Sequence, residues 1–250
     1  LLAGIGPGDE VLTPLFTCTA TNIPLLYIGA EPVFVDIEPN TLNFNVADAR
    51  RRISERTKAI VVVHYGGLPC DMDDIHQLAR EYDIPVIEDA AHALGARYRG
   101  RPVGALSDYT MFSFQAIKHL TTADGGMLTL KDSSQRPLAD SLRWFGIDRE
   151  KKQSGIWEND ITEIGFKYQM TDLAASLGLA ALEEWDETLG KRQSLLEAYL
   201  EELQDVPDVK VLSEPQEDSE HAAWLMTVAV EDRRGFQKKL LEHGIESNQV

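Results

Sequence analysis

A lysine with hydroxyl side chains and glycines close to it offers the most specific chemistry in this chain. Lys118 lies in residues 113–126, a segment that begins with Ser113 and also contains two adjacent threonines and two adjacent glycines. The Ser113 hydroxyl can donate to a phosphate oxygen, the Lys118 amine can form a Schiff base, and the glycines let the backbone approach a ligand. The segment therefore suits a phosphate-bearing aldehyde.

An aspartate supplies the partner that this amine would need. Asp89 ends an apolar, strand-like run at residues 85–89, and Lys118 follows another such run at 109–114. Ligands of open α/β sheets bind at the carboxyl ends of the strands. An aspartate beneath a pyridine ring keeps the ring nitrogen protonated, and a lysine at the aldehyde carbon holds the ring and moves a proton. Two strand ends facing one crevice can therefore meet both roles.

The elements that must position these residues alternate between strand-like and helical patterns. We predict strands at residues 10–13, 32–36, 59–64, 85–89 and 109–114, and helices at 19–28, 46–54 and 71–82. This order is typical of an α/β fold in which helices cover both faces of a large, mostly parallel sheet.

The last third of the chain has a different pattern. Residues 171–182 are rich in small side chains, which predicts a tightly buried helix, and 185–203 form an amphipathic helix with a kink expected at Gly190. Strands at 209–212 and 224–230 and a helix at 234–243 then predict a partial small α+β domain. We place the domain boundary near Trp185, between a large domain at 1–184 and the linking helix with the small domain at 185–250.

Composition argues against several classes of protein. The 250-residue chain has a net charge of -17, which disfavours nucleic acid as a partner. No apolar run has the roughly 18 residues of a membrane helix, and no signal peptide is visible. Two cysteines without a C-x-x-C pair favour a reducing, cytoplasmic compartment. The opening Leu1-Leu-Ala-Gly4 is typical of a helix end, so we expect segments to be missing from both ends.

Two further patterns have simpler interpretations than a binding site. Three histidines with nearby acids fit no compact metal-ligand spacing, so we assign structural or surface roles to His64, His76 and His119 and predict no metal. The glycines at positions 4, 6 and 8 are spaced somewhat like a dinucleotide-binding loop. They lead into a strand instead of a helix, and Pro7 interrupts the pattern.

Several ordered motifs carry a resemblance to a known family. They are Gly6-Pro-Gly-Asp-Glu-Val11, Pro32-Val-Phe-Val-Asp36, residues 86–104, Phe112-Ser-Phe-Gln-Ala-Ile-Lys118, Asp124-Gly-Gly126 and Gly165-Phe-Lys-Tyr-Gln-Met-Thr-Asp172. Together they resemble the sugar aminotransferases of the DegT/DnrJ/EryC1/StrS family over nearly the whole chain. The resemblance implies a pyridoxal-phosphate enzyme of the aspartate-aminotransferase fold (fold type I), with the cofactor in the large domain and active sites shared across a homodimer.

The resemblance also implies roles for individual residues. Lys118 would be the Schiff-base lysine, Asp89 would contact the pyridine nitrogen, and Ser113 would hold the phosphate. His92 takes a position, often Gln or His, that contacts the cofactor near its ring hydroxyl.

Two positions depart from the family pattern. Cys18 stands where many relatives place an aromatic residue that stacks on the ring, and it offers less stacking surface. Lys167 stands where relatives usually have an Asn that contacts the phosphate of the neighbouring subunit. A lysine there would still neutralise phosphate.

Each of these residues also has a simpler possible role. A lone lysine is normally a solvated surface charge, an aspartate can cap the helix that follows it, and a serine can bond to local backbone. A cysteine can be a small buried hydrophobe, a histidine can be structural, and a second lysine can form a salt bridge. In the order of these roles, the residues are Lys118, Asp89, Ser113, Cys18, His92 and, as the second lysine, Lys167.

The resemblance implies, as the expected activity, transfer of an amino group, with glutamate as the donor, to a nucleotide-linked keto-sugar. A pyridoxal-phosphate sugar dehydratase is one alternative, although members of that branch replace the Schiff-base lysine with histidine, and here His119 is only the neighbour of Lys118. A non-catalytic relative of the same fold is the other alternative.

Overall fold

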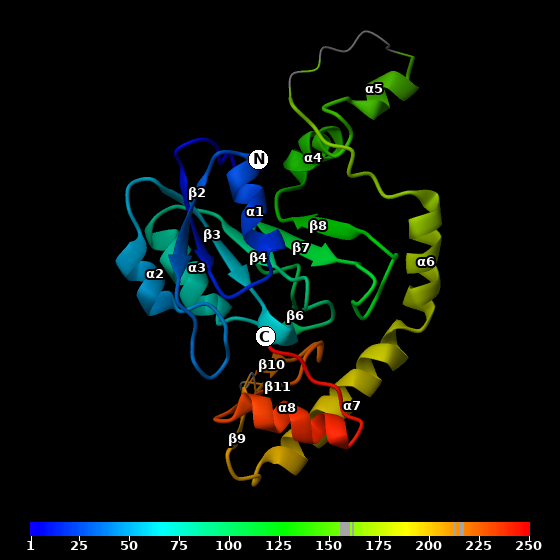
Figure 1. Ribbon diagram of the computed structural model, residues 1–250. Helices are drawn as coiled ribbons and strands as arrows, with labels where there is room; N and C mark the ends of the chain where they lie inside the picture. Colours follow the sequence, from blue (N-terminus) through cyan, green and yellow to red (C-terminus); the bar gives the residue numbers. More distant parts are fainter. Residues whose placement is uncertain (156–160, 162, 213, 216–217) are drawn as a thin grey trace.

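The computed structural model describes residues 1–155, 161, 163–212, 214–215 and 218–250. Figure 1 shows a central sheet with helices packed around it. The long helices α6 and α7 lead away from the sheet to a smaller group of elements near the end of the chain.

The central sheet has six strands in the order β2-β1-β3-β4-β7-β8. All neighbouring pairs are parallel except β7 with β8, which is antiparallel. The strands are β1 (Glu10–Pro14), β2 (Glu31–Val35), β3 (Thr57–Val63), β4 (Val86–Asp89), β7 (Tyr109–Ser113) and β8 (Gly126–Leu130). The α/β class and the mostly parallel sheet predicted from the sequence are thus confirmed, whereas β8 was not predicted.

Helices cover both faces of this sheet because the side chains of a strand point alternately to its two faces. One face packs on α2 (Val46–Arg52) and α3 (Met72–Glu81), and the other packs on α1 (Thr19–Tyr27). The alternation is clearest in β3, where Ile60 and Val62 belong to the first core and Ala59 and Val61 to the second.

A buried polar network connects three neighbouring strands of the sheet. His64, which follows β3, lies 2.7 Å through Nε2 from Oε2 of Glu88 in β4, and Oε1 of Glu88 accepts a bond of 3.0 Å from Thr110 in β7. Because Nδ1 of His64 accepts the backbone N–H of Cys70, Nε2 carries the proton and donates to Glu88. His64 therefore has a structural environment. Among the described residues, no group of three or more His, Cys, Asp or Glu side chains could hold a metal ion.

The rest of the chain forms smaller elements. They are η1 (Tyr65–Gly67), β5 (Arg97–Tyr98), β6 (Arg101–Pro102), η2 (Ser133–Gln135), α4 (Arg136–Leu142), α5 (Arg149–Gln153), α6 (Asp172–Glu183), α7 (Trp185–Leu203), β9 (Val209–Leu212), β10 (Ser219–Glu220), β11 (Thr227–Val230) and α8 (Arg233–Glu242). Strands β9 and β11 pair antiparallel, and β10 joins β5 and β6 in a second small sheet. Within the described part of the chain, no helix is both long and apolar enough to span a membrane.

The prediction of a tightly buried helix at 171–182 is wrong for this chain. Only Gly178 of α6 is buried, and Leu173 is 82% exposed. Small residues let another segment approach the helix closely, as Thr122 does at Gly178. Burial of the helix also requires other elements that pack over it, and small residues do not supply these. The apolar side chains of α6 therefore face outward within a single chain.

Two further expectations differ from the structure. Gly190 does not interrupt α7; the break lies six residues earlier, at Glu184, whose backbone angles (φ -105°, ψ 9°) leave the helical range. Strand β11 begins at Thr227, so Trp224 lies outside it. The backbone N–H of Trp224 instead donates to the carbonyl of Gly66 in η1, so it is not paired with a neighbouring strand. The boundary near Trp185 stays a prediction.

The core predicts how stability responds to truncation. Leu78→Ala removes a fully buried side chain (0% exposed) from α3 and should lower the free energy of unfolding by about 2–5 kcal/mol. Leu26→Ala in α1, where the leucine is 56% exposed, is the matched control and should cost less than about 1 kcal/mol. Urea titrations followed by circular dichroism measure both values. Equal losses in the two variants would contradict the assignment of the core.

Candidate active site

Asp89 lies at the carboxyl end of β4, where the register of the sheet fixes its surroundings. It is paired with Met111 of β7 and is only 9% exposed. Its Oδ2 accepts a 2.7 Å hydrogen bond from the Thr21 hydroxyl of α1, and Oδ1 accepts the backbone N–H of Ala91 at 3.0 Å. Asp89 thus caps a turn, not a helix. These two hydrogen bonds fix the orientation of the carboxylate.

Lys118 lies in the loop that follows β7, in a turn closed by a bond from its own N–H to the carbonyl of Gln115. Burial lowers the pKa of the Lys118 amine, while the Asp89 carboxylate and the Cys18 thiol act in the opposite direction. The Asp89 carboxylate therefore lies close enough to the Lys118 amine to act on it electrostatically. A lowered pKa makes the neutral, nucleophilic amine more available near neutral pH.

His92 follows Asp89 by one turn and is held as a neutral imidazole. Burial, and then the charges of Lys118 and His119, lower its pKa to about 3. Nδ1 accepts the backbone N–H of Gly66 at 3.3 Å, so the ring proton lies on Nε2. The residue can therefore donate one hydrogen bond from Nε2 without carrying a charge.

Ser113 and Cys18 lie at the ends of neighbouring elements. Ser113 ends β7, and its Oγ accepts the backbone N–H of Gln115 at 3.3 Å. A hydroxyl that accepts in this way keeps its own proton available for another acceptor. Cys18 is the N-cap residue of α1 and an exposed free thiol, and its side chain makes no capping hydrogen bond. It is therefore not the buried hydrophobe that its residue type alone could suggest.

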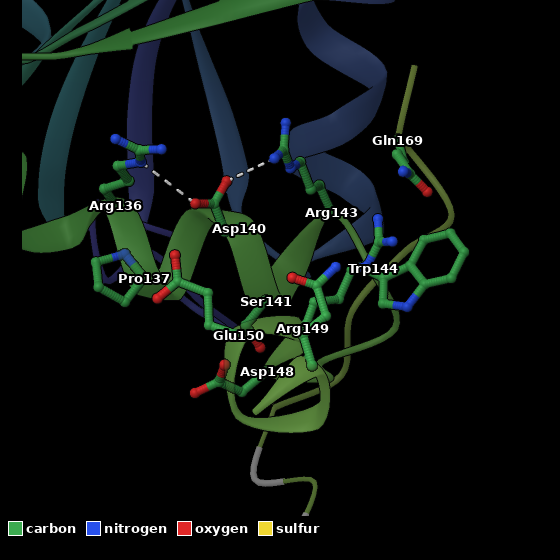
Figure 2. Close-up of a pocket in the computed structure, with 11 residues that line it drawn as sticks. Arg136, Pro137, Asp140, Ser141, Arg143, Trp144, Asp148, Arg149, Glu150 and Gln169 are labelled. Carbon is green, nitrogen blue, oxygen red and sulfur yellow. Dashed lines mark hydrogen bonds and ion pairs between the residues drawn. The ribbon is translucent and has the colours of Figure 1, made fainter. Parts of the chain in front are cut away.

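Lys167 lies apart from these residues. It forms an isolated antiparallel bridge with Trp144, and its Nζ is 4.0 Å from the centre of the Trp144 ring. Trp144 also lines a cavity of about 460 Å³ beside α4 and α5. Figure 2 shows that three arginines reach this cavity and that Asp140 binds two of them, Arg136 and Arg143. The residues that line this cavity do not include Asp89, His92, Ser113 or Lys118.

Sequence reasoning missed three residues that shape the crevice. Thr21 has no unusual feature in the sequence. It donates a hydrogen bond to Asp89, which is 68 residues further along the chain. Trp224 comes from the far end of the chain, and its ring lies 3.7 Å from that of His92. Gly67 has a φ of 104°, and a Cβ there would lie 2.9 Å from the His92 carbonyl oxygen. A glycine beside an apolar strand was the one available signal, because glycine tolerates such angles.

Comparison with known proteins agrees with this architecture. The model of the DegT/DnrJ/EryC1/StrS aminotransferase family matches residues 1–250. The UDP-4-amino-4-deoxy-L-arabinose–oxoglutarate aminotransferase of Shewanella sediminis is 40% identical over 236 residues, which is 92% of this chain and 60% of that protein. The chain spans between about half and 60% of the length of the curated relatives it matches.

Solved structures show the same fold. AtS13 from Actinomadura melliaura superposes with a TM-score of 0.94 at 39% identity, covering 100% of this chain and 68% of that one. The putative sugar aminotransferase Spr1654 from Streptococcus pneumoniae, in its PMP form, gives a TM-score of 0.90 at 33% identity and covers 99% and 69%. Spr1654 has also been solved in a PLP form. The predicted fold class is thus confirmed by these neighbours.

The electrostatics of the crevice predict a linked titration of His92. In the Lys118→Ala variant the pKa of His92 should rise from about 3, because a neighbouring positive charge is removed. Lys167→Ala, which removes a distant lysine, should leave this pKa unchanged. NMR titration of the imidazole measures both effects. A His92 that already gains its proton near pH 6.5 in the unaltered protein would contradict the geometry.

Proposed function

The chain belongs to the DegT/DnrJ/EryC1/StrS aminotransferase family, and from that premise we propose that it transfers an amino group from glutamate to a nucleotide-linked keto-sugar. Aminotransferases of this family depend on pyridoxal phosphate, in keeping with the PMP and PLP forms of Spr1654. The name of the Shewanella relative joins a UDP-linked amino sugar with oxoglutarate, the keto acid of glutamate. These names support the choice of substrates.

The observation that supports the proposal is that the Asp89 carboxylate lies close enough to the Lys118 amine to act on it electrostatically. These side chains suit pyridoxal phosphate. The Asp89 carboxylate suits the pyridine nitrogen, the Lys118 amine suits the aldehyde, and the Ser113 hydroxyl suits the phosphate. When bound, this cofactor supplies an electron sink that stabilises negative charge on the donor's α-carbon. The residues that would hold it are Asp89, His92, Ser113 and Lys118, with Cys18 beside them and Lys167 contributed by a second subunit.

Each side chain then has a defined task. Asp89, whose carboxylate oxygens accept hydrogen bonds from Thr21 and Ala91, would face the ring nitrogen and favour its protonated form. Lys118 would be freed when the amine of the donor takes its place, and would then move the proton from the donor's α-carbon to the cofactor's aldehyde carbon. Burial lowers the pKa of Lys118, which favours the unprotonated form that such a base needs. The second half-reaction would use the same residues in the reverse order on the sugar ketone.

Assembly as a homodimer in the cytoplasm is part of the same proposal. In α6, Leu173, Leu177, Leu179 and Leu182 are all exposed within one chain. Several large exposed apolar side chains on one helix are a feature that a protein interface would cover. A second subunit could cover it, and such an arrangement would also explain how Lys167 reaches a phosphate that lies outside its own chain's crevice.

The two alternatives are less well supported. A dehydratase of this fold would use a histidine in place of the lysine, yet Lys118 is present and Nε2 of its neighbour His119 lies 2.8 Å from the backbone oxygen of Ala222. A non-catalytic relative would not need the retained set of Asp89, Ser113 and Lys118.

The role of Lys118 can be tested by substitution. Lys118→Ala should lose the near-visible absorbance of the lysine-bound cofactor and at least about 10²–10⁴-fold of the turnover, because both the attachment point and the base are removed. Lys58→Ala, an exposed lysine in β3, is the control. Spectroscopy and steady-state kinetics on the full-length protein measure these effects. A Lys118→Ala variant with normal turnover would refute the assignment.

The reaction class can be tested with substrates. Incubation of the protein with a panel of nucleotide keto-sugars and glutamate should give amino-sugar and 2-oxoglutarate in equal amounts. Loss of water without 2-oxoglutarate would instead indicate a dehydratase. A colourless protein that never binds pyridoxal phosphate would indicate a non-catalytic relative.

A further inference from the structure

The indole of Trp224 contacts two residues of the candidate site at once. Its ring is stacked on the imidazole of His92, with 3.7 Å between ring centres and 21° between planes. Nζ of Lys118 lies 3.9 Å from the centre of the same indole. The described ion pairs include none with Lys118, so the face of an aromatic ring is the principal close partner of this amine.

The position of Trp224 is fixed through both its backbone and its ring. The N–H groups of Trp224 and Leu225 both donate to the carbonyl of Gly66, at 3.1 and 3.0 Å. The indole Nε1 donates to the carbonyl of Ile117 at 3.2 Å, one residue before Lys118. Gly66 in turn donates its N–H to Nδ1 of His92. Indole, imidazole and the lysine loop are thus connected to one another by hydrogen bonds.

This segment reaches the site from the far part of the chain. The backbone N–H of Ala222 donates to the carbonyl of Gly67 at 2.9 Å, and His119 contacts the carbonyl of Ala222. Ala223 has a φ of 55°, a left-handed conformation that non-glycine residues seldom adopt. Such angles are kept where the surroundings fix them, often at functional sites. Here they turn the chain so that Trp224 projects onto His92.

A cation lying over an indole is attracted by the electron-rich face of the ring, and the attraction is stronger where water is excluded. In the proposed function, the amine would leave the cofactor in one half-reaction and return to it in the other, so it needs a place close to the reacting carbon in between. The indole provides such a place, and it favours the protonated amine less strongly than a second carboxylate would.

We propose that Trp224 is a positioning residue that holds the Lys118 amine in the crevice whenever Lys118 is not attached to the cofactor, and that keeps the His92 ring in place by stacking. This role rests on the proposed function, in which Lys118 is displaced and then moves a proton. It assigns a site residue to the part of the chain beyond the predicted domain boundary.

The contact can be measured without any reaction. The chain has four tryptophans, so protein labelled with 5-fluorotryptophan should give four fluorine NMR signals, and Trp224→Phe identifies that of Trp224. In cofactor-free protein, Lys118→Met should shift the Trp224 signal and leave that of Trp144 in place. Lys167→Met is the matched control, because its amine lies 4.0 Å from the Trp144 ring, and it should do the reverse. An unmoved Trp224 signal in Lys118→Met would overturn the proposal.

The role in turnover is tested by comparing two variants of Trp224 in the full-length protein. Trp224→Leu removes the aromatic face and should lower kcat of the half-reaction with glutamate about 10-fold, with KM changed less than about twofold. Trp224→Phe keeps a smaller aromatic face and should recover most of kcat. Equal losses in both variants, or a change in KM alone, would overturn the role because they would indicate loss of packing or of binding.

The two proposals fail in different ways. If the unaltered protein transfers amino groups and Trp224→Leu is as active as it, only the role of Trp224 is refuted. If the unaltered protein binds pyridoxal phosphate but transfers no amino group, the proposed function and the role that rests on it are both refuted.

Discussion

The parallel register between β4 and β7 is the constraint on which the candidate site depends. It pairs Asp89 with Met111, so the carboxylate and the lysine loop after β7 leave the sheet at the same edge. The buried network of His64, Glu88 and Thr110 links β3, β4 and β7 just behind that edge. A carboxylate at 0% exposure is tolerated only when hydrogen-bonded partners surround it, so this network favours one register over any shifted one.

Elements that are distant in the sequence then complete the crevice from two sides. Helix α1 brings the Thr21 hydroxyl to one carboxylate oxygen of Asp89, and the segment before β11 brings the indole of Trp224 to His92 and Lys118. The result is a carboxylate oriented by two hydrogen bonds, an imidazole whose pKa burial lowers to about 3, and an amine whose pKa burial also lowers. The pKa shifts of His92 and Lys118 follow from their positions more than from their residue types.

Much of this arrangement could be predicted from the sequence, because buried parallel strands are continuous apolar runs and ligands gather at their carboxyl ends. That reasoning predicts Asp89, Ser113 and Lys118 as residues of the site. Strand β8 was missed because Met127 and Leu128 are exposed and give no buried run. The packing of α6 and the place of Trp224 depend on which surfaces meet in space, and neither periodicity nor residue type contains that information.

The most direct test is to identify the lysine that carries the cofactor. The full-length protein, loaded with pyridoxal phosphate and reduced with borohydride, would be digested and its peptides mapped by mass spectrometry. The account predicts a single modified site, Lys118, and loss of that modification when the carboxylate partner is removed in Asp89→Ala, because the amine and the carboxylate hold the same ring. Modification of a different lysine, or none at all in a protein that transfers amino groups, would contradict it.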